Sequence, residues 1–99
     1  MTIDLNLDLL AELSETPGLP GREYLVADKI QAALPAGWET ETDQIGNLVC
    51  QFPSWENCGP KVMLMAHMDE VGLIVRRITP DGFLHVQRLG GMGLRSLPG

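Results

Sequence analysis

The sequence lacks several features that would assign a class of protein at once. It has no apolar run of about 18 residues, so we expect no membrane-spanning helix. Its start shows no basic stretch followed by an apolar core, so we expect no secretory signal. The two cysteines, Cys50 and Cys58, are eight positions apart, which fits neither a close metal-ligand pair nor a disulfide framework. We therefore expect free thiols and a cytoplasmic protein.

Basic residues are also scarce. Seven lysines and arginines stand against 13 acidic residues, which gives a formal net charge of −6. Eight of the acidic residues precede position 42, so the first part of the chain is the acidic part. Such a charge balance repels phosphate backbones, and nucleic acid is not expected as a partner. A length of 99 residues allows one domain at most, or a piece of a larger one.

The first third of the sequence predicts two helices. Leu5, Leu9 and Leu13 recur every four residues, which is typical of one face of a short amphipathic helix that Asp4 or Asn6 can cap. A stiff turn rich in proline and glycine follows at residues 16–21 and ends this helix.

A second helix is predicted directly after that turn. We expect Gly21 to cap it and Glu23 to lie in its first turn, where a negative charge suits the helix dipole. A structural role for Glu23 is favoured over a role in a site. The apolar stripe of this helix comprises Val26, Ile30, Ala33 and Leu34.

From Trp38 onwards the hydrophobic period changes to two, which predicts strands. Residues 38–42 and 48–52 flank a turn at 43–47 and should form a hairpin. Residues 71–78 and 83–89 flank a second tight-turn sequence and should form another antiparallel hairpin.

Residues 62–66 are apolar at every position, which predicts a strand covered on both faces. A parallel strand needs a crossover of a dozen or more residues, usually a helix, and only two helices are predicted. We therefore predict the opening of an α/β domain, a mixed sheet with flanking helices, that is cut short. Such a chain has unpaired strand edges and an uncovered apolar face, so we expect it to self-associate or to be marginally folded.

The candidate chemistry lies at the end of this strand, at His67 and Asp69. Two residues apart, their side chains point the same way on an extended chain. A carboxylate so placed can hydrogen-bond the imidazole, which fixes its tautomer and raises its basicity as a metal ligand. On spacing alone, a structural histidine beside an acid is an equally good interpretation. A zinc site usually has three or four protein ligands, so this pair would be only part of one.

The other histidine, the cysteines and the methionines give weaker evidence for a functional site. His85 is interpreted as a member of the alternating strand 83–89, and the thiols show no ligand spacing. Met63, Met65 and Met68 are expected to fill a core rather than to form a copper or cofactor site. No serine stands in a Gly-x-Ser-x-Gly elbow.

The stretch 62–75 resembles the signature strand of the dinuclear-metal aminopeptidases, the family that includes glutamyl aminopeptidase and the tetrahedral, self-compartmentalising aminopeptidases. Three further segments resemble this family in the same order. They are residues 16–23 before the second helix, Asp43-x-x-Gly46-Asn47-Leu48 in the first hairpin, and Gly82-Phe83-Leu84 with Gly90-Gly91 at the start of an inserted β-domain.

The resemblance implies a fold and a site. The fold would be a phosphorylase/hydrolase-like metallopeptidase domain, with its catalytic α/β part over residues 1–69 and an inserted all-β dimerisation domain beginning at 70–99. His67 would bind one of two divalent metal ions, zinc or cobalt, and Asp69 would orient it. The remaining ligands and the glutamate that acts as general base come later in family members and have no counterpart here.

The resulting hypothesis is the N-terminal portion of a metal-dependent aminopeptidase, which releases N-terminal residues from peptides by metal-activated water. The 99 residues alone are expected to be inactive, and the full-length protein to be a homo-oligomer. The alternative is a self-contained interaction domain that binds a partner through its edge strands, with a structural His67. A glycoside hydrolase follows only from endoglucanase labels in the family, and the adjacent Asp69 and Glu70 cannot flank one glycosidic bond.

Overall fold

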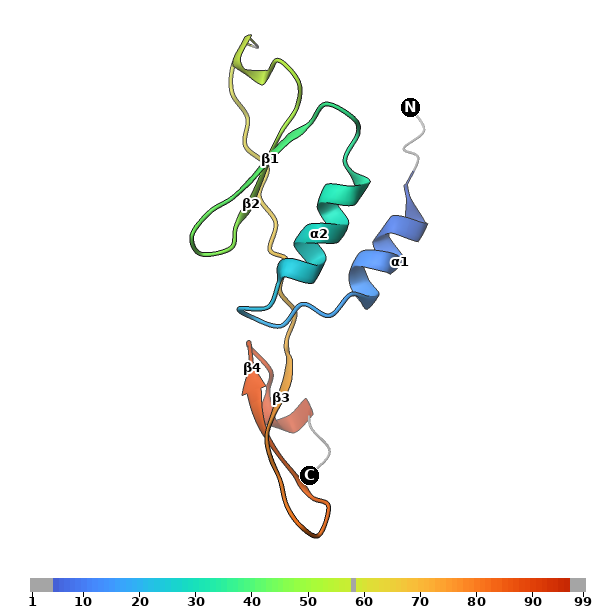
Figure 1. Cartoon of the computed structure of the whole chain (residues 1–99), viewed down its shortest axis with the longest axis vertical. Helices are drawn as coiled ribbons and strands as arrows, with labels where there is room; N and C mark the ends of the chain where they lie inside the picture. Colours follow the sequence, from blue (N-terminus) through green and yellow to red (C-terminus); the bar gives the residue numbers. More distant parts are fainter. Residues whose placement is uncertain (1–4, 58, 97–99) are drawn as a thin grey trace.

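Two helices open the chain in the computed structural model, which describes residues 5–57 and 59–96 (Figure 1). Helix α1 spans Leu7–Glu15 and helix α2 spans Tyr24–Ala33. The Asn6 side chain caps α1, because its Oδ1 accepts a hydrogen bond from the Leu9 N–H at 3.0 Å. The prediction of an Asn6 cap is thus confirmed, and Asp4 lies outside the described residues.

The start of α2 differs from the prediction. Glu23, not Gly21, occupies the N-cap position, and no acidic residue lies in the first turn. Gly21 has a φ of 79° and belongs to the preceding turn, which the Arg22 N–H closes on the Leu19 carbonyl at 2.8 Å. The Glu23 carboxylate accepts the Gly21 N–H at 2.7 Å. Glu23 therefore braces the turn from the helix side instead of completing a helix cap.

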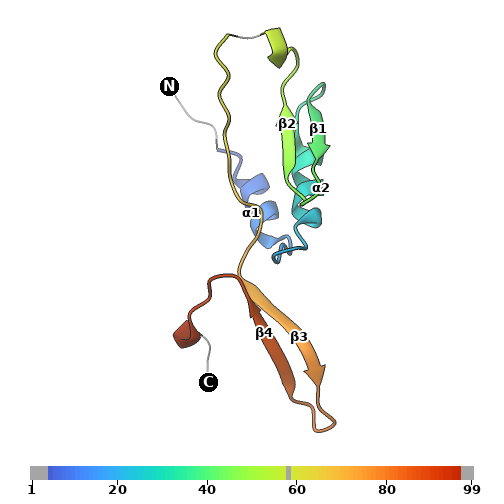
Figure 2. The ribbon, with the colours of Figure 1, turned by 90° about the vertical axis from the view of Figure 1, so that its left-hand side faces the viewer.

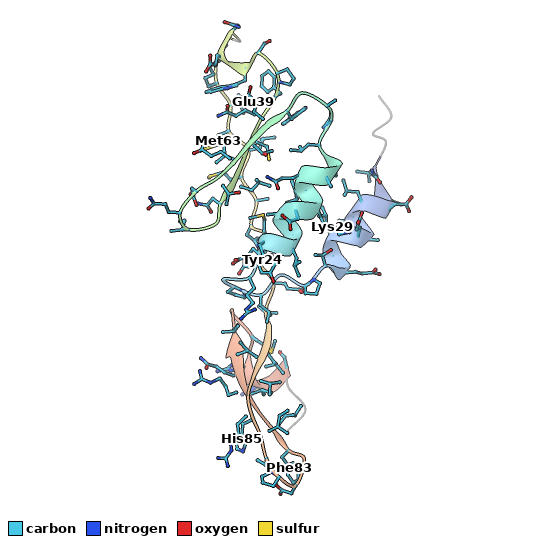
Figure 3. All side chains as sticks on the ribbon, viewed as in Figure 1. Tyr24, Lys29, Glu39, Met63, Phe83 and His85 are labelled. Atoms are coloured by element: carbon cyan, nitrogen blue, oxygen red, sulfur yellow. The ribbon has the colours of Figure 1, made fainter. Side chains whose placement is uncertain are left out.

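Few side chains in the helical part are buried. Val26 and Ala27 of α2 are the only buried hydrophobic side chains among residues 5–57, 59–93 and 95–96. In the predicted stripe, Ile30 and Leu34 are half-buried and Ala33 is exposed. Lys29 reaches across to Glu12 of α1 at 2.5 Å (Figure 3), but both side chains are about half exposed, so the pair adds little stability.

Four strands form two separate hairpins, as predicted. Strand β1 (Glu39–Thr42) pairs antiparallel with β2 (Leu48–Gln51), and β3 (Gly72–Ile78) pairs antiparallel with β4 (Leu84–Leu89). We call β3 and β4 together the arm. Short 3₁₀ helices follow β2 at Trp55–Asn57 and β4 at Leu94–Ser96. Each sheet in the described part of the chain has two strands, so the predicted mixed sheet is not formed there.

The prediction of a covered strand at 62–66 is wrong in the same way. Residues 61–66, which we call the unpaired segment, run extended from the first hairpin to the arm without a neighbouring strand (Figure 2). Val62, Met63, Leu64 and Met65 are 82%, 78%, 92% and 83% exposed. Met63 and Met65 therefore do not fill a core, and Met68 is only half-buried. An apolar strand needs neighbours from elsewhere in the chain, and the described residues provide none.

The helical part and the arm meet where the 16–21 turn contacts the chain after His67, a contact that we call the clasp. The Glu70 N–H donates to the Gly18 carbonyl at 2.7 Å. A Cβ on Gly18 would lie 2.8 Å from the Val26 Cγ2 and 3.1 Å from the Met68 carbonyl oxygen. A Cβ on Gly72 would lie 2.2 Å from a methyl carbon of Leu19. Two glycines thus permit the close approach.

The molecule as a whole is elongated, with extents of 61 × 35 × 22 Å and a radius of gyration of 18.2 Å. A compact domain of about 100 residues has a radius of gyration of about 13 Å. The accessible surface is 8703 Å², against roughly 5,500 Å² for a compact protein of this mass. Much apolar surface is therefore uncovered. Among the residues that the structure describes, none of the helices is both long and apolar enough to cross a bilayer.

The clasp generates a first prediction. Gly18→Ala should destabilise the fold by about 1–3 kcal/mol, because the added methyl group must displace Val26 or the Met68 carbonyl. Gly59→Ala is the matched control, since open space surrounds its Cβ position. Urea unfolding followed by circular dichroism measures both variants. Equal midpoints for the two variants would contradict this account of the clasp.

The first hairpin turn generates a second prediction. Asp43 accepts hydrogen bonds from the Asn47 side chain at 2.8 Å and from the N–H groups of Asn47 and Ile45 at 2.9 and 3.0 Å. The bond from the Asn47 side chain is the largest of the effects that lower the pKa of Asp43. The ionised form therefore stabilises the turn above the ordinary aspartate pKa of about 3.9, and this contribution is lost as the pH falls through the lower folded value.

An acid titration followed by the Ile45 and Asn47 amide signals tests this prediction. Both amides should lose protection from hydrogen exchange together, below about pH 3.9. Asp43→Ala should remove the acid transition and leave the turn unprotected at neutral pH. A transition that persists in Asp43→Ala would assign it to another group.

Candidate functional site

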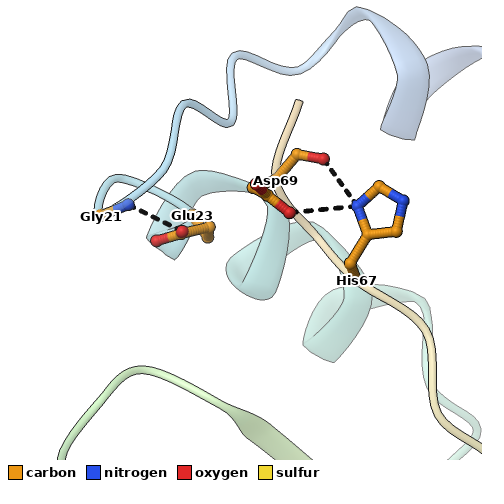
Figure 4. A network of polar contacts seen from close by, with 4 residues as sticks. All are labelled: Gly21, Glu23, His67 and Asp69. Carbon is orange, nitrogen blue, oxygen red and sulfur yellow. Dashed lines mark hydrogen bonds and ion pairs between the residues drawn. The ribbon is translucent and has the colours of Figure 1, made fainter. Parts of the chain in front are cut away.

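The two predicted site residues follow the unpaired segment and precede the arm in the chain, and Figure 4 shows them from close by. The His67 Nδ1 is 2.9 Å from the carbonyl oxygen of Asp69 and 3.1 Å from its Oδ1. Both oxygens are acceptors, so Nδ1 must carry the proton and donate it. In the neutral imidazole the other ring nitrogen, Nε2, then keeps its lone pair. The chain between the two residues is short, so the contact follows directly from their spacing.

This pair is open to solvent. The side chains of His67 and Asp69 are 84% and 41% exposed. Nε2 is therefore accessible to a ligand or an ion, and no packed neighbour restricts the ring on that side. The Asp69 contact fixes which nitrogen is available, and it leaves the position of the ring itself weakly determined.

The surroundings of the pair come from the clasp. Glu70 follows Asp69 directly, and its N–H donates a hydrogen bond to the Gly18 carbonyl. Asp69 is half-buried beside this contact. The Glu23 carboxylate points to the Gly21 N–H in Figure 4 rather than to the imidazole. Glu23 thus acts on the turn that holds this stretch of chain, which is a structural role but not the predicted one in the first turn of the helix.

Sequence reasoning missed the clasp. It identified the turn at residues 16–21, and it identified His67 and Asp69, but it gave no signal that the turn would hold Glu70. The contact joins residues 52 positions apart, and neither local spacing nor hydrophobic period encodes it. The two adjacent Pro-Gly and Leu-Pro-Gly steps could have suggested a close backbone approach, although not its partner.

The pair does not complete a metal centre here. No group of three or more histidine, cysteine, aspartate or glutamate side chains in residues 5–57 and 59–96 could hold a metal ion. His85 lies on the arm, in strand β4 (Figure 3). Cys50 is a free, half-buried thiol in β2, and Cys58 lies outside the described residues. The arrangement can offer one imidazole nitrogen of defined tautomer.

Comparison with known proteins places this arrangement in context. The sequence pattern of the M42 glutamyl aminopeptidase family matches residues 46–99. A lysyl aminopeptidase of Pyrococcus furiosus is 37% identical over 87 residues, which cover 86% of this chain and 24% of that protein. A glutamyl aminopeptidase of Lactococcus lactis is 37% identical over 84 residues, which cover 83% of this chain and 22% of that protein. The chain spans about a quarter of the length of these curated relatives.

The family match covers the part of the chain that matters most for the site. It begins in the first hairpin turn and runs through the unpaired segment, the His67–Asp69 pair and the arm. Because it covers more than half of the chain, the chain belongs to the M42 glutamyl aminopeptidase family.

Proposed function

We propose that this chain provides the strand with the first metal ligand of an aminopeptidase that releases N-terminal residues from peptides. The observation that carries the proposal is the contact of His67 Nδ1 with Asp69, inside the range that matches the family. Relatives named lysyl and glutamyl aminopeptidase support the reaction class. We assign the activity to a polypeptide of the relatives' length rather than to these 99 residues, which span about a quarter of it.

His67 is proposed as the ligand and Asp69 as the residue that positions it. The residues present fit one ligand position, because the imidazole is exposed and its Nε2 lone pair is available. Asp69 keeps the proton on Nδ1 and so leaves Nε2 as the ring nitrogen that can bind an ion. Two divalent ions, zinc or cobalt, would complete such a centre, and when bound they polarise a peptide carbonyl and activate water. The other ligands would have to come from outside the described residues.

The arm is proposed as the beginning of an inserted β-domain, with residues 1–69 as part of the catalytic domain. In support, the arm points away from the two helices beyond the clasp (Figure 1) and pairs with no other strand in the described chain. Its large apolar side chains are exposed and await a partner surface. Those exposed by 40% or more are Leu73, Val75, Ile78, Leu84 and Val86, and Phe83 in the turn between the two strands is also exposed. Such a surface suits an oligomer of the full-length protein.

An interaction domain with a structural His67 is the second candidate. The observation that favours it is the unpaired segment, whose exposed backbone is a ready template for strand addition. This candidate gives His67 no role in metal binding. The two candidates therefore differ in what His67 does with zinc.

The incomplete site predicts that the 99-residue chain is inactive. Purified and loaded with zinc or cobalt, it should not cleave an aminoacyl anilide, because one imidazole cannot hold two ions in a defined geometry. Absorbance of the released aniline measures the reaction. Cleavage that His67→Ala abolishes would show that a complete site assembles from these residues, and the proposal of a partial site would then be wrong.

The His67–Asp69 contact predicts a tautomer. At pH 8, where imidazole is ordinarily neutral, His67 should carry its proton on Nδ1, and zinc should perturb Nε2 first. Asp69→Ala removes the Oδ1 acceptor but keeps the backbone carbonyl of residue 69 at 2.9 Å from Nδ1, so the Nδ1–H form should persist, and zinc binding should weaken by about 10-fold. Long-range ¹H–¹⁵N correlation spectra report both effects, with His85 as the internal reference. A wild-type His67 protonated on Nε2, or zinc binding that Asp69→Ala leaves unchanged, would favour the structural role.

A further inference from the structure

The peptide group that joins Asp69 to Glu70 makes a hydrogen bond at each end. Its carbonyl oxygen lies 2.9 Å from the His67 Nδ1, which donates to it. Its N–H, which belongs to Glu70, donates to the Gly18 carbonyl at 2.7 Å. A peptide group is planar and rigid, so a partner that holds its N–H also restricts the direction of its carbonyl oxygen. The Gly18 carbonyl therefore orients an acceptor that His67 uses.

The two hydrogen bonds on this peptide group also strengthen each other. Donation of the N–H to Gly18 polarises the peptide group and increases the negative charge on the Asp69 carbonyl oxygen. The Asp69 carboxylate is a second acceptor at 3.1 Å, so the Nδ1 proton of His67 is shared between two oxygens. The Asp69 side chain is 41% exposed, whereas Gly18 is buried. Of the two acceptors, the carbonyl is thus the one that the rest of the fold holds in place.

The Gly18 carbonyl lies in the turn that Glu23 braces. The Glu23 carboxylate accepts the Gly21 N–H at 2.7 Å (Figure 4). The Arg22 N–H closes the turn on the Leu19 carbonyl at 2.8 Å. Both bonds form directly after Gly18 along the chain and restrict the path of the backbone that carries its carbonyl. A single side chain, that of Glu23, is therefore connected to His67 through three successive hydrogen bonds and the turn between them.

We propose that Glu23 is a positioning residue for the metal ligand His67, and that it acts through its turn. The inference rests on the proposed function, because it concerns the imidazole that we assign as a metal ligand. By holding the turn, Glu23 keeps the Gly18 carbonyl in place, and the peptide group after Asp69 then presents its carbonyl oxygen to Nδ1. Nε2 is left as the ring nitrogen for a divalent ion. Glu23 itself contacts neither the ion nor the imidazole.

Glu23→Ala tests the link between Glu23 and the clasp. It removes the acceptor of the Gly21 N–H, so the Glu70 amide should exchange with solvent about fivefold faster, the factor expected for one lost hydrogen bond. Glu23→Gln keeps an acceptor oxygen and should restore most of the protection. Asp28→Ala is the matched control, since it removes one negative charge from an exposed side chain of the same helix. Hydrogen exchange followed by NMR measures all three variants.

The link between the clasp and the imidazole is tested in an Asp69→Ala background, where the carbonyl of residue 69 is the remaining acceptor of this pair. There, Glu23→Ala should shift His67 towards the Nε2–H form and weaken zinc binding by a further factor of about 3 to 10. This is less than the roughly 10-fold to 100-fold effect of a group that bonds a ligand directly. Glu23→Gln should restore the Nδ1–H form, and Asp28→Ala should leave it unchanged. Long-range ¹H–¹⁵N correlation spectra at pH 8 report the tautomer, with His85 as the internal reference.

Glu70→Pro tests the same link without altering the helix. Proline has no N–H, so this variant removes the donor to the Gly18 carbonyl directly. In the Asp69→Ala background it should produce the same shift towards Nε2–H as Glu23→Ala does. Glu70→Ala keeps the N–H and should keep the Nδ1–H form.

Several results would overturn the inference. A Glu70 amide that stays fully protected in Glu23→Ala would show that the turn does not need Glu23, and an unprotected Glu70 amide in the wild type would contradict the clasp itself. Loss of this protection with an unchanged tautomer in the double variant would confine Glu23 to a structural role. The exchange rates and the tautomer are measured without metal. Failure of zinc to bind the wild-type His67 would therefore contradict the proposed function separately.

Discussion

The clasp is the contact on which the arrangement of this chain depends. Through the Glu70 hydrogen bond to Gly18 and the passage of Leu19 over Gly72, it joins the helical part to the arm. Glu23 stabilises the turn that makes the contact, by holding the Gly21 N–H. The same contact fixes the chain directly after His67 and Asp69. The position of the candidate site therefore depends on two glycines and one carbonyl more than on any side chain of the site itself.

What the clasp cannot provide is a core. Val26 and Ala27 are buried, whereas the most apolar stretch of the sequence lies in water. Burial of a large aliphatic side chain contributes about 1.5–3 kcal/mol, and ordering the backbone of one residue costs about 1–2 kcal/mol. Because few side chains are buried and many residues are ordered, the net free energy of unfolding of this chain should be small. Most of the stabilisation that this sequence can generate is thus held in surface that is not yet covered, above all at Val62 to Met65.

Features that arise within a few residues could be predicted from the sequence, and features that need distant partners could not. The Asn6 cap, the Asp43–Asn47 turn and both hairpins rest on hydrogen bonds between residues close in sequence. The contact of His67 with Asp69 is of the same kind, and it follows from a spacing of two. A covered strand at 62–66 requires neighbouring strands, and the pattern of apolar side chains within the segment does not show whether such neighbours exist. The cap predicted at Gly21 is wrong because Gly21, with its positive φ, belongs to the turn that precedes the helix.

The unpaired segment determines how firmly the candidate site is positioned. Asp69 sets the tautomer of His67, but it does not fix the ring in space, since the ring is 84% exposed and follows a segment with no neighbours. A metal ligand acts in a centre only when the strand that carries it is held against the strands that carry the others. In the proposed full-length aminopeptidase, strands paired with the edges of residues 62–66 would provide that support. A strand that is apolar enough to lie within a sheet therefore exposes apolar surface and unpaired backbone groups until the neighbouring strands are in place.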